Sequence, residues 1–168
     1  MWDKLCKQVQ VERDQLRHLL DTHRSLLIKC ERVTADPIEL SALAAVLHSF
    51  YTGIENIFKR IALTLDGGLP EGEIWHRRLL DSMATASSVR SAVISQSLRD
   101  NLRGYLDFRH VFRHAYTFEL RWQKMSGLVI NCASVFRQLE TELDAFLESL
   151  RSGTSEPGSG KGDGRKSS

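Results

Sequence analysis

Apolar side chains recur at helical spacing over most of this 168-residue chain, and this periodicity constrains the fold more than any other feature. Four segments carry the pattern, residues 3–32, 37–65, 97–112 and 121–151, and a shorter one covers 74–83. Apolar residues three or four positions apart form a stripe along one side of an α-helix. No segment alternates apolar and polar residues for long enough to indicate a strand. The sequence therefore predicts an all-α protein, an antiparallel four-helix bundle with one short extra helix.

Prolines and glycines mark the expected boundaries of these elements. Pro37 lies near the start of the second helix, and Gly67-Gly68 with Pro70 follows its end. Glycine there can adopt the left-handed helix cap, and proline prevents continuation. The last 17 residues contain five glycines and five serines and almost no apolar side chain, so they are expected to be disordered. One folded domain, residues 1–151, is predicted, with a disordered tail at 152–168.

Composition narrows the class of protein. A net charge of +2 is too small to indicate a nucleic-acid or membrane partner by itself. Charges interrupt every apolar stretch, so no membrane span is expected, and the N-terminal residues lack an apolar run of signal-peptide length. Cys6, Cys30 and Cys132 are widely spaced, which favours free, buried thiols. These features predict a cytoplasmic protein, and no cofactor is expected.

The helix at 97–112 breaks its own pattern. At 100° per residue, its apolar residues occupy one sector, and Arg109 falls near the middle of it. The residues of that sector are Leu98, Leu102, Tyr105, Leu106 and Phe112. A buried guanidinium is costly without a partner. Either this face opens into a cleft, or a carboxylate from a neighbouring helix, such as Glu55, forms a structural ion pair with Arg109.

Two histidines and a tyrosine follow this arginine. His110 and His114 are four positions apart and share a helix face, and Tyr116 comes two residues later. Arginine, histidine and tyrosine together can supply a phosphate clamp, a proton shuttle and a phenol. Two histidines at this spacing are also typical of a helix-borne metal-ligand pair. That alternative is less favoured, because the glutamate of the H-E-x-x-H motif is absent and no third ligand is evident, so no metal site is predicted.

The run Arg109-x4-His114-x-Tyr116 resembles the R-x4-H-x-Y signature of HepT-type toxins. These toxins belong to the HEPN superfamily of small helical-bundle ribonucleases. His110 matches the polar residue that usually follows the arginine, and the segments 47–60 and 66–76 also look like their HepT counterparts. The resemblance covers residues 1–150 and implies a HEPN-like bundle.

The resemblance also implies metal-independent cleavage of RNA, with Arg109 as the phosphate clamp, His114 as the acid/base and His110 in support. RNA carries its own nucleophile, the 2′-hydroxyl, so no cleavage of DNA is expected. Residues five apart lie roughly 140° apart on an ideal helix. Arg109 and His114 can therefore converge only if the helix ends or distorts between them, or if the site combines two subunits. HEPN dimers are similar in placing two motifs at a shared cleft, which favours a homodimer.

Tyr116 has a separate expected role. HepT toxins are paired with an MntA-type nucleotidyltransferase antitoxin that transfers AMP to the tyrosine of this motif, although packing beside Phe118 and Trp122 is the alternative. Further candidate cleft residues are Tyr51, Glu55 and Arg113, for which ordinary packing or a solvated face is an equally good explanation. A rival function stays open, namely a non-catalytic HEPN bundle that acts as a binding or regulatory partner of a nucleotidyltransferase.

Overall fold

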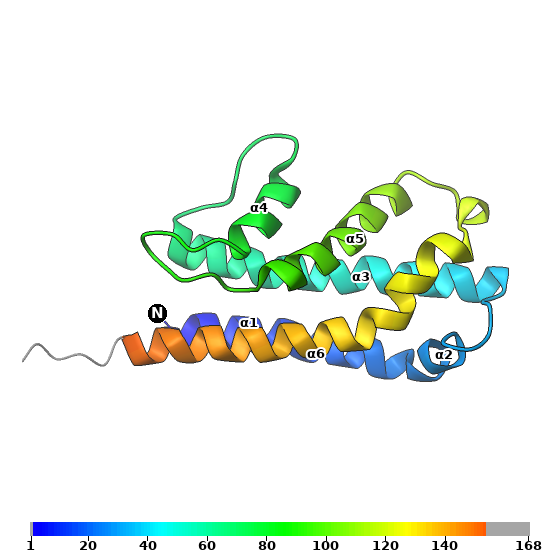
Figure 1. Ribbon diagram of the computed structural model, residues 1–168, viewed down its shortest axis with the longest axis horizontal. Helices are drawn as coiled ribbons and strands as arrows, with labels where there is room; N and C mark the ends of the chain where they lie inside the picture. Colours follow the sequence, from blue (N-terminus) through cyan, green and yellow to red (C-terminus); the bar gives the residue numbers. More distant parts are fainter. Residues whose placement is uncertain (1, 154–168) are drawn as a thin grey trace, which may run out of the picture.

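The computed structural model of the protein describes residues 2–153, and within these residues every regular element is a helix (Figure 1). The helices are α1 (Trp2–Thr22), α2 (Arg24–Lys29), α3 (Pro37–Ile61), α4 (Trp75–Met83), α5 (Gln96–Phe112) and α6 (Trp122–Gly153). A π-helical turn, Ala62–Asp66, extends α3, and a 3₁₀ turn, Thr117–Glu119, precedes α6. The predicted all-α class is thereby confirmed.

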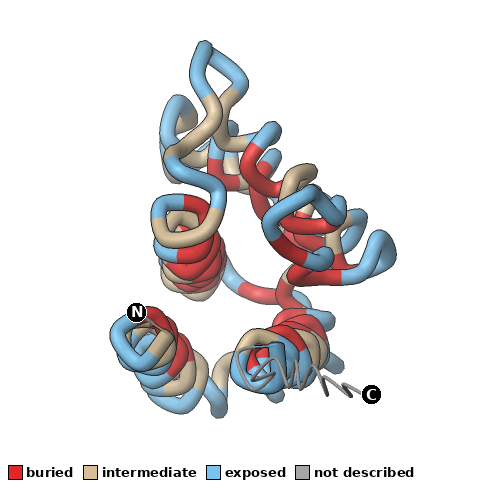
Figure 2. Tube along the Cα trace, turned by 90° about the vertical axis from the view of Figure 1, so that its left-hand side faces the viewer, coloured by how far each residue is buried: buried red, intermediate tan, exposed pale blue. Residues whose placement is uncertain are grey.

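Helix α3 is the centre of the bundle. It contacts α1, α4, α5 and α6; α1 and α6 lie below it in Figure 1, and α4 and α5 lie above it. The chain runs in alternating directions through α1, α3, α5 and α6. The buried stretches of these helices turn toward one another when the bundle is viewed end-on (Figure 2). The structure therefore has the expected bundle with α4 as the extra helix.

The two ends of α3 follow the sequence signals. Asp36 caps the N-terminus, where its side chain accepts a hydrogen bond from the Glu39 amide at 2.8 Å and the Glu39 carboxylate accepts one from the Asp36 amide at 3.1 Å. Pro37 occupies the first turn, where its missing N–H costs nothing. At the other end, Gly67 adopts a left-handed conformation with φ of +79°, as predicted. The reciprocal cap and the glycine thus set where α3 begins and ends. Glu55 lies within this helix.

The predicted single helix over residues 3–32 is wrong in one respect, because it breaks at His23. This residue leaves helical geometry, with φ −105° and ψ 12°, and its Nδ1 lies 2.8 Å from the Leu19 carbonyl oxygen. The break separates α1, which packs mainly on α3, from the short α2, which packs on α6. The continuous apolar periodicity of residues 3–32 therefore does not correspond to one continuous helix.

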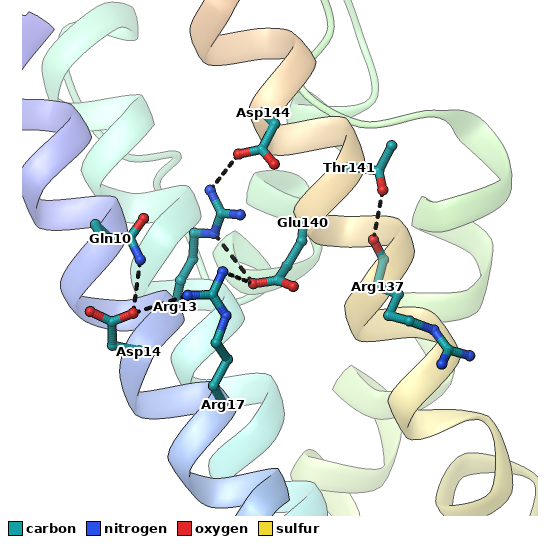
Figure 3. A network of polar contacts seen from close by, with 8 residues as sticks. All are labelled: Gln10, Arg13, Asp14, Arg17, Arg137, Glu140, Thr141 and Asp144. Atoms are coloured by element: carbon teal, nitrogen blue, oxygen red, sulfur yellow. Dashed lines mark hydrogen bonds and ion pairs between the residues drawn. The ribbon is translucent and has the colours of Figure 1, made fainter.

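A polar network joins α1 to α6 on the side of α3 away from α4 and α5 (Figure 3). The buried Arg13 donates from Nη1 to Asp144 Oδ1 at 2.6 Å, and its Nε lies 3.6 Å from Glu140 Oε1, which Arg17 also contacts. Burial opposes the charge of Arg13, but the hydrogen bond and negative charge of Asp144 prevail and raise its pKa. This network ties the two helices together away from the residues of the predicted motif.

Close contact between α1 and α3 depends on Gly53. A Cβ atom at this position would lie 2.6 Å from Cδ2 and 3.0 Å from Cγ of Leu16, a buried residue of α1. Such distances are well inside van der Waals contact. Glycine therefore allows the two helix axes to approach at this point.

The cysteines are free, as predicted. Cys30 and Cys132 are buried, and burial raises the pKa of Cys132 to about 12, so its thiol stays protonated. Cys6 is only partly buried, which differs from the expectation. None of the helices in the described part of the chain is long and apolar enough to cross a membrane. Helix α6 runs through Gly153, and the rest of the predicted disordered tail, 154–168, lies outside the described residues.

Candidate active site

Arg109 lies on the buried face of α5, where the periodicity placed it. Its side chain is only 5% exposed, and its Nη2 donates a hydrogen bond at 2.9 Å to Oε2 of Glu55, which is 2% exposed. Because both groups are buried, each needs the other to offset the cost of leaving water. The carboxylate anticipated from a neighbouring helix is therefore present, and it comes from the middle of α3.

Two further residues of α3 hold the guanidinium. Its central carbon lies 4.9 Å from the ring centroid of Tyr51, a cation–π contact, and its Nη1 is 3.5 Å from Thr52 Oγ1. The Tyr51 hydroxyl is buried, with no hydrogen-bond partner among the residues that the structure describes. Burial, and after it the charge of Glu55, raises the pKa of Tyr51, so the phenol stays neutral. Tyr51 thus contacts the face of the guanidinium as a neutral phenol.

His76, from the start of α4, completes this cluster. Its Nδ1 lies 2.7 Å from Glu55 Oε2 and 3.1 Å from Arg109 Nη2. The sequence predicted no role for His76, and the only signal was its position at the end of the segment 66–76. Its convergence with Arg109 depends on how α4 packs against α3 and α5, which periodicity cannot disclose.

A cleft of about 480 Å³ opens beside this cluster, between the start of α4 and the end of α5. Ile74, Leu106 and Val111 line it together with the charged and imidazole side chains of Glu73, His76, Arg77, Asp107, Arg109, His110 and Arg113. Three arginines and two histidines face two carboxylates, so the lining suits an anionic ligand. Arg113 and His110 thus lie where they were expected, whereas Tyr51 and Glu55 reach the site only through their contacts with Arg109.

Helix α5 ends between Arg109 and His114, which is one of the two solutions expected for their spacing. The amides of Arg113 and His114 donate to the carbonyls of Arg109 and Val111 at 3.2 and 3.1 Å as the helix closes. His114 is exposed, and its ring centroid is 5.2 Å from that of His110. Among the described residues, His114 is not one of those that line the cleft. Within one chain, His110 therefore lies between Arg109 and His114.

Tyr116 lies in the loop after α5 and is 70% exposed. Its ring stacks on that of the exposed Phe118, with centroids 5.3 Å apart and planes 9° from parallel. The other two tyrosines of the chain, Tyr51 and Tyr105, are buried, and the Tyr105 hydroxyl donates to the Leu128 carbonyl at 2.7 Å. Tyr116 therefore carries the one phenol of the three that an external enzyme can reach.

Comparison with known proteins identifies the family of the chain. The family model described as HepT-like protein matches residues 42–150, which is more than half of the sequence. The chain belongs to the HepT-like family. No curated protein and no solved structure matched the chain. The matched range runs from α3 to the end of α6, so the cluster around Arg109 and the whole R-x4-H-x-Y run lie within it.

Charge at the site of this HepT-like protein also acts on His48, one turn before Thr52 on α3. Burial, followed by the positive charges of Arg109 and Arg113, lowers the pKa of His48. Its ring contacts Phe112 at a centroid distance of 5.5 Å. Within residues 2–153, no three His, Cys, Asp or Glu side chains are grouped so that they could hold a metal ion. The described residues thus assemble an arginine-centred site.

Proposed function

We propose that this HepT-like protein is the endoribonuclease toxin of a toxin–antitoxin module and cleaves RNA without a metal ion. Family membership suggests a component of such a module. The observation that carries the finer proposal is the buried Arg109, which Glu55 holds in place while it lines an anion-suited cleft with two imidazoles. A guanidinium fixed in advance is the arrangement that stabilises charge on a transferring phosphoryl group.

The chemistry needs three functions. The 2′-hydroxyl of RNA attacks the adjacent phosphorus, a base takes its proton, and an acid protonates the departing 5′-oxygen. Tyr51, Thr52 and Glu55 hold Arg109 from one side. Its remaining N–H groups are then available to phosphate oxygens in the cleft. Arg77 and Arg113 line the same cleft and can bind neighbouring phosphates.

We assign His114 to the acid, in a homodimer. His114 is exposed at the end of α5 and lies outside the cleft of its own chain. A second copy facing this cleft would bring a second His114 and His110 toward Arg109. Exposed apolar side chains near the cleft, Ile74 and Val111, offer surface for such a contact.

Tyr116 is the proposed control point. Its exposed hydroxyl is a competent acceptor for AMP from an MntA-like nucleotidyltransferase antitoxin. An adenylate there would add a negative charge three residues after Arg113, which lines the cleft, and could compete with RNA for this arginine. The buried positions of Tyr51 and Tyr105 support this assignment, because neither hydroxyl can reach a transferase.

The second candidate is a non-catalytic bundle that binds a nucleotidyltransferase. One observation favours it: the Glu55 carboxylate already pairs with Arg109, and His114 does not line the cleft. On this view the ion pair is structural, and the arginine makes no contact with RNA. The two functions differ in whether purified protein cleaves RNA at all.

The test is cleavage of RNA by purified protein in excess chelator. We expect 2′,3′-cyclic phosphate ends, no cleavage of DNA, and loss of about 100-fold or more in Arg109→Lys and His114→Ala, since a point charge cannot replace the two-point clamp. The matched control is Arg60→Lys, which changes an exposed arginine in the last turn of α3. Cleavage that disappears with chelator and returns with zinc or magnesium would contradict the proposal, and no cleavage under any condition would favour the second candidate.

The proposed modification has its own test. Co-expression with the partner transferase should add the mass of one AMP to the wild-type chain and none to Tyr116→Phe, which folds normally because only one exposed oxygen is lost. The Phe variant should also resist neutralisation by the transferase with ATP. An AMP adduct that persists in Tyr116→Phe would show that Tyr116 is not the modified residue.

A further inference from the structure

We propose that His76 is the base that takes the proton of the RNA 2′-hydroxyl, and that Glu55 fixes its ring for this purpose. The role rests on the proposed cleavage of RNA in the cleft between α4 and α5. It follows from which nitrogen of His76 carries hydrogen, from what part of the ring is accessible, and from how His76 is placed relative to Arg109.

The Glu55 carboxylate determines the tautomer of His76. Arg109 Nη2 lies 2.9 Å from Oε2 of Glu55, and Lys59 Nζ lies 3.7 Å from Oε1, so two cations flank this carboxylate. An ionised carboxylate only accepts hydrogen bonds. The 2.7 Å contact between His76 Nδ1 and Oε2 therefore requires hydrogen on Nδ1. In the neutral ring, Nε2 is then left with a free lone pair.

In this tautomer the approach of Arg109 Nη2 to His76 Nδ1, at 3.1 Å, is a contact between two donors and not a hydrogen bond, because a guanidinium cannot accept. The contact of Nδ1 with Glu55 Oε2 is shorter, at 2.7 Å, and both donors can direct a hydrogen to that oxygen. Arg109 and His76 are thus two donors on one buried acceptor. This arrangement fixes the guanidinium and the imidazole relative to each other, as a base is fixed by its orienting carboxylate in other hydrolytic sites.

The accessible edge of His76 is the one that carries Nε2. The side chain is 30% exposed and lines the cleft, while its Nδ1 edge is occupied by the buried Glu55. Trp75 stacks on the ring, with centroids 3.6 Å apart, and Lys59 Nζ lies 5.3 Å from the Trp75 ring. Stacking restricts rotation of the imidazole, so Nε2 is held toward the cleft.

The other two histidines of the proposed site, His110 and His114, lack these features. His110 lines the cleft but is exposed, and the ring that it contacts is His114. No carboxylate among the described residues forms a hydrogen bond or ion pair with either ring. Of the three, His76 is the one with a ring oriented by a buried acid beside the phosphate-binding arginine.

Two protons move during the proposed cleavage. His76 Nε2 takes the 2′-hydroxyl proton as the O2′–P bond forms, the P–O5′ bond breaks, and the departing O5′ takes a proton from His114. The products are a 2′,3′-cyclic phosphate and a 5′-hydroxyl, and His76 returns its proton to water while His114 regains one. Arg109 binds the phosphate oxygens throughout.

A pair of substrates separates the base from the acid. His76→Asn keeps an amide N–H that can reach Glu55 but removes the basic Nε2, and it is compared with His114→Ala and wild type. One RNA carries an ordinary linkage and the other a sulfur in place of the bridging O5′, because a thiolate leaves without protonation. We expect His76→Asn to lose about 100-fold or more on both substrates, and His114→Ala to lose activity on the ordinary RNA alone.

Several results would overturn the assignment. Cleavage by His76→Asn at the wild-type rate removes the role, and rescue of this variant by the sulfur-containing RNA makes His76 the acid. The pH profile is a further readout: wild type is expected to lose activity at acidic pH as the base takes up a proton, and this limb should be missing from His76→Asn, which a purely structural role would not produce. Wild-type protein that cleaves neither RNA overturns the proposed function and this role with it.

Nitrogen NMR on folded wild-type protein tests the tautomer without relying on activity or on any variant's stability. Labelled His76 should show a protonated, pyrrole-type Nδ1 and an unprotonated, pyridine-type Nε2 at a pH where the ring is neutral. Hydrogen on Nε2 would rule out the proposed base. Glu55→Gln should alter this pattern, since an amide can donate to Nδ1, whereas the control Glu31→Gln, an exposed residue remote from α5, should not.

Discussion

Arg90 and Arg109 are both buried, at 8% and 5% exposure, but the protein surrounds them differently. Arg90 grips Asp66 with Nε and Nη2 at 2.7 and 2.9 Å, and it donates to the carbonyls of Ser82, Thr85 and Ser91 at 3.1–3.2 Å. A guanidinium has five N–H donors, and Arg90 uses all of them within the protein. It fastens the segment between α4 and α5 to the end of the π-helical turn.

Arg109 donates hydrogen bonds to Glu55 and Thr52, and its Nη2 lies 3.1 Å from His76 Nδ1; its guanidinium has no other polar contact within residues 2–153. Its guanidinium rests on Tyr51 and lines a cleft. Burial of an arginine alone is therefore a poor sign of function. A better sign of function is an arginine whose unused N–H donors lie at the edge of a cleft, beside an oriented imidazole. The contrast gives four predictions, from the largest expected effect to the smallest.

The largest effect is expected from Arg90→Ala. This change removes the donor of three carbonyl groups and of the Asp66 carboxylate at once. The Asp66 side chain is 23% exposed, so the expected cost is that of losing strong charged hydrogen bonds, about 2–3 kcal/mol. Urea unfolding followed by circular dichroism measures the loss, with Arg60→Ala as the exposed control. A loss below about 1 kcal/mol would place Arg90 with the weakly stabilising surface pairs.

Arg109→Ala should cost less, about 1–2 kcal/mol of unfolding free energy. Glu55 keeps His76 and Lys59 as partners after the arginine is gone, so its charge is not left alone. Cleavage of RNA should nevertheless fall by about 100-fold or more. The same unfolding experiment decides between the two views of this residue: destabilisation as large as that of Arg90→Ala would make Arg109 a structural arginine.

Replacing both partners sharpens the comparison further. A buried ion pair exchanged for apolar groups of similar volume is often neutral in stability, so Arg109→Leu with Glu55→Leu should unfold within about 1 kcal/mol of wild type. Arg90→Leu with Asp66→Leu should stay destabilised, because the three carbonyls lose their donor in either case. Equal recovery in both double variants would contradict the difference drawn between them.

The smallest effect is on the titration of His48. The positive charge of Arg109 helps to lower the pKa of His48, so Arg109→Gln should raise it, whereas Arg90→Gln should leave it unchanged. Proton NMR of the His48 imidazole measures its pKa in both variants. A lowered pKa means that the unfolded chain binds more protons below about pH 6.5, so stability should fall as the pH decreases through that range, and less steeply in Arg109→Gln.

Much of this molecule could be predicted from local pattern. The periodicity places the long helices and puts Arg109 on the buried face of α5, and Gly67 and Pro37 mark the ends of α3. Local rules succeed here because each depends on residues within one or two turns of the same helix. Glu55 was named as one possible partner of Arg109, beside the alternative of an open cleft, and the structure has both the ion pair and the cleft.

The features that were missed depend on distant contacts. His76 reaches Glu55 and Arg109 only because α4 folds back over α3 and α5. Arg90 and Asp66 are 24 residues apart, with α4 between them in the chain. The break at His23 also follows from packing of α2 on α6. No rule that operates within a single helix contains this information.

Gly53 restricts how sequences of this fold can change over evolutionary time. Every single substitution there adds at least a Cβ, which would meet Leu16 at 2.6 Å. A larger residue at 53 therefore requires the Leu16 side chain to shift within the buried contact between α1 and α3, or residue 16 to become smaller. The second route leaves a void that costs about 2–5 kcal/mol for Leu→Ala. A library randomised at both positions and selected for folding should accordingly return glycine at 53 wherever leucine is kept at 16.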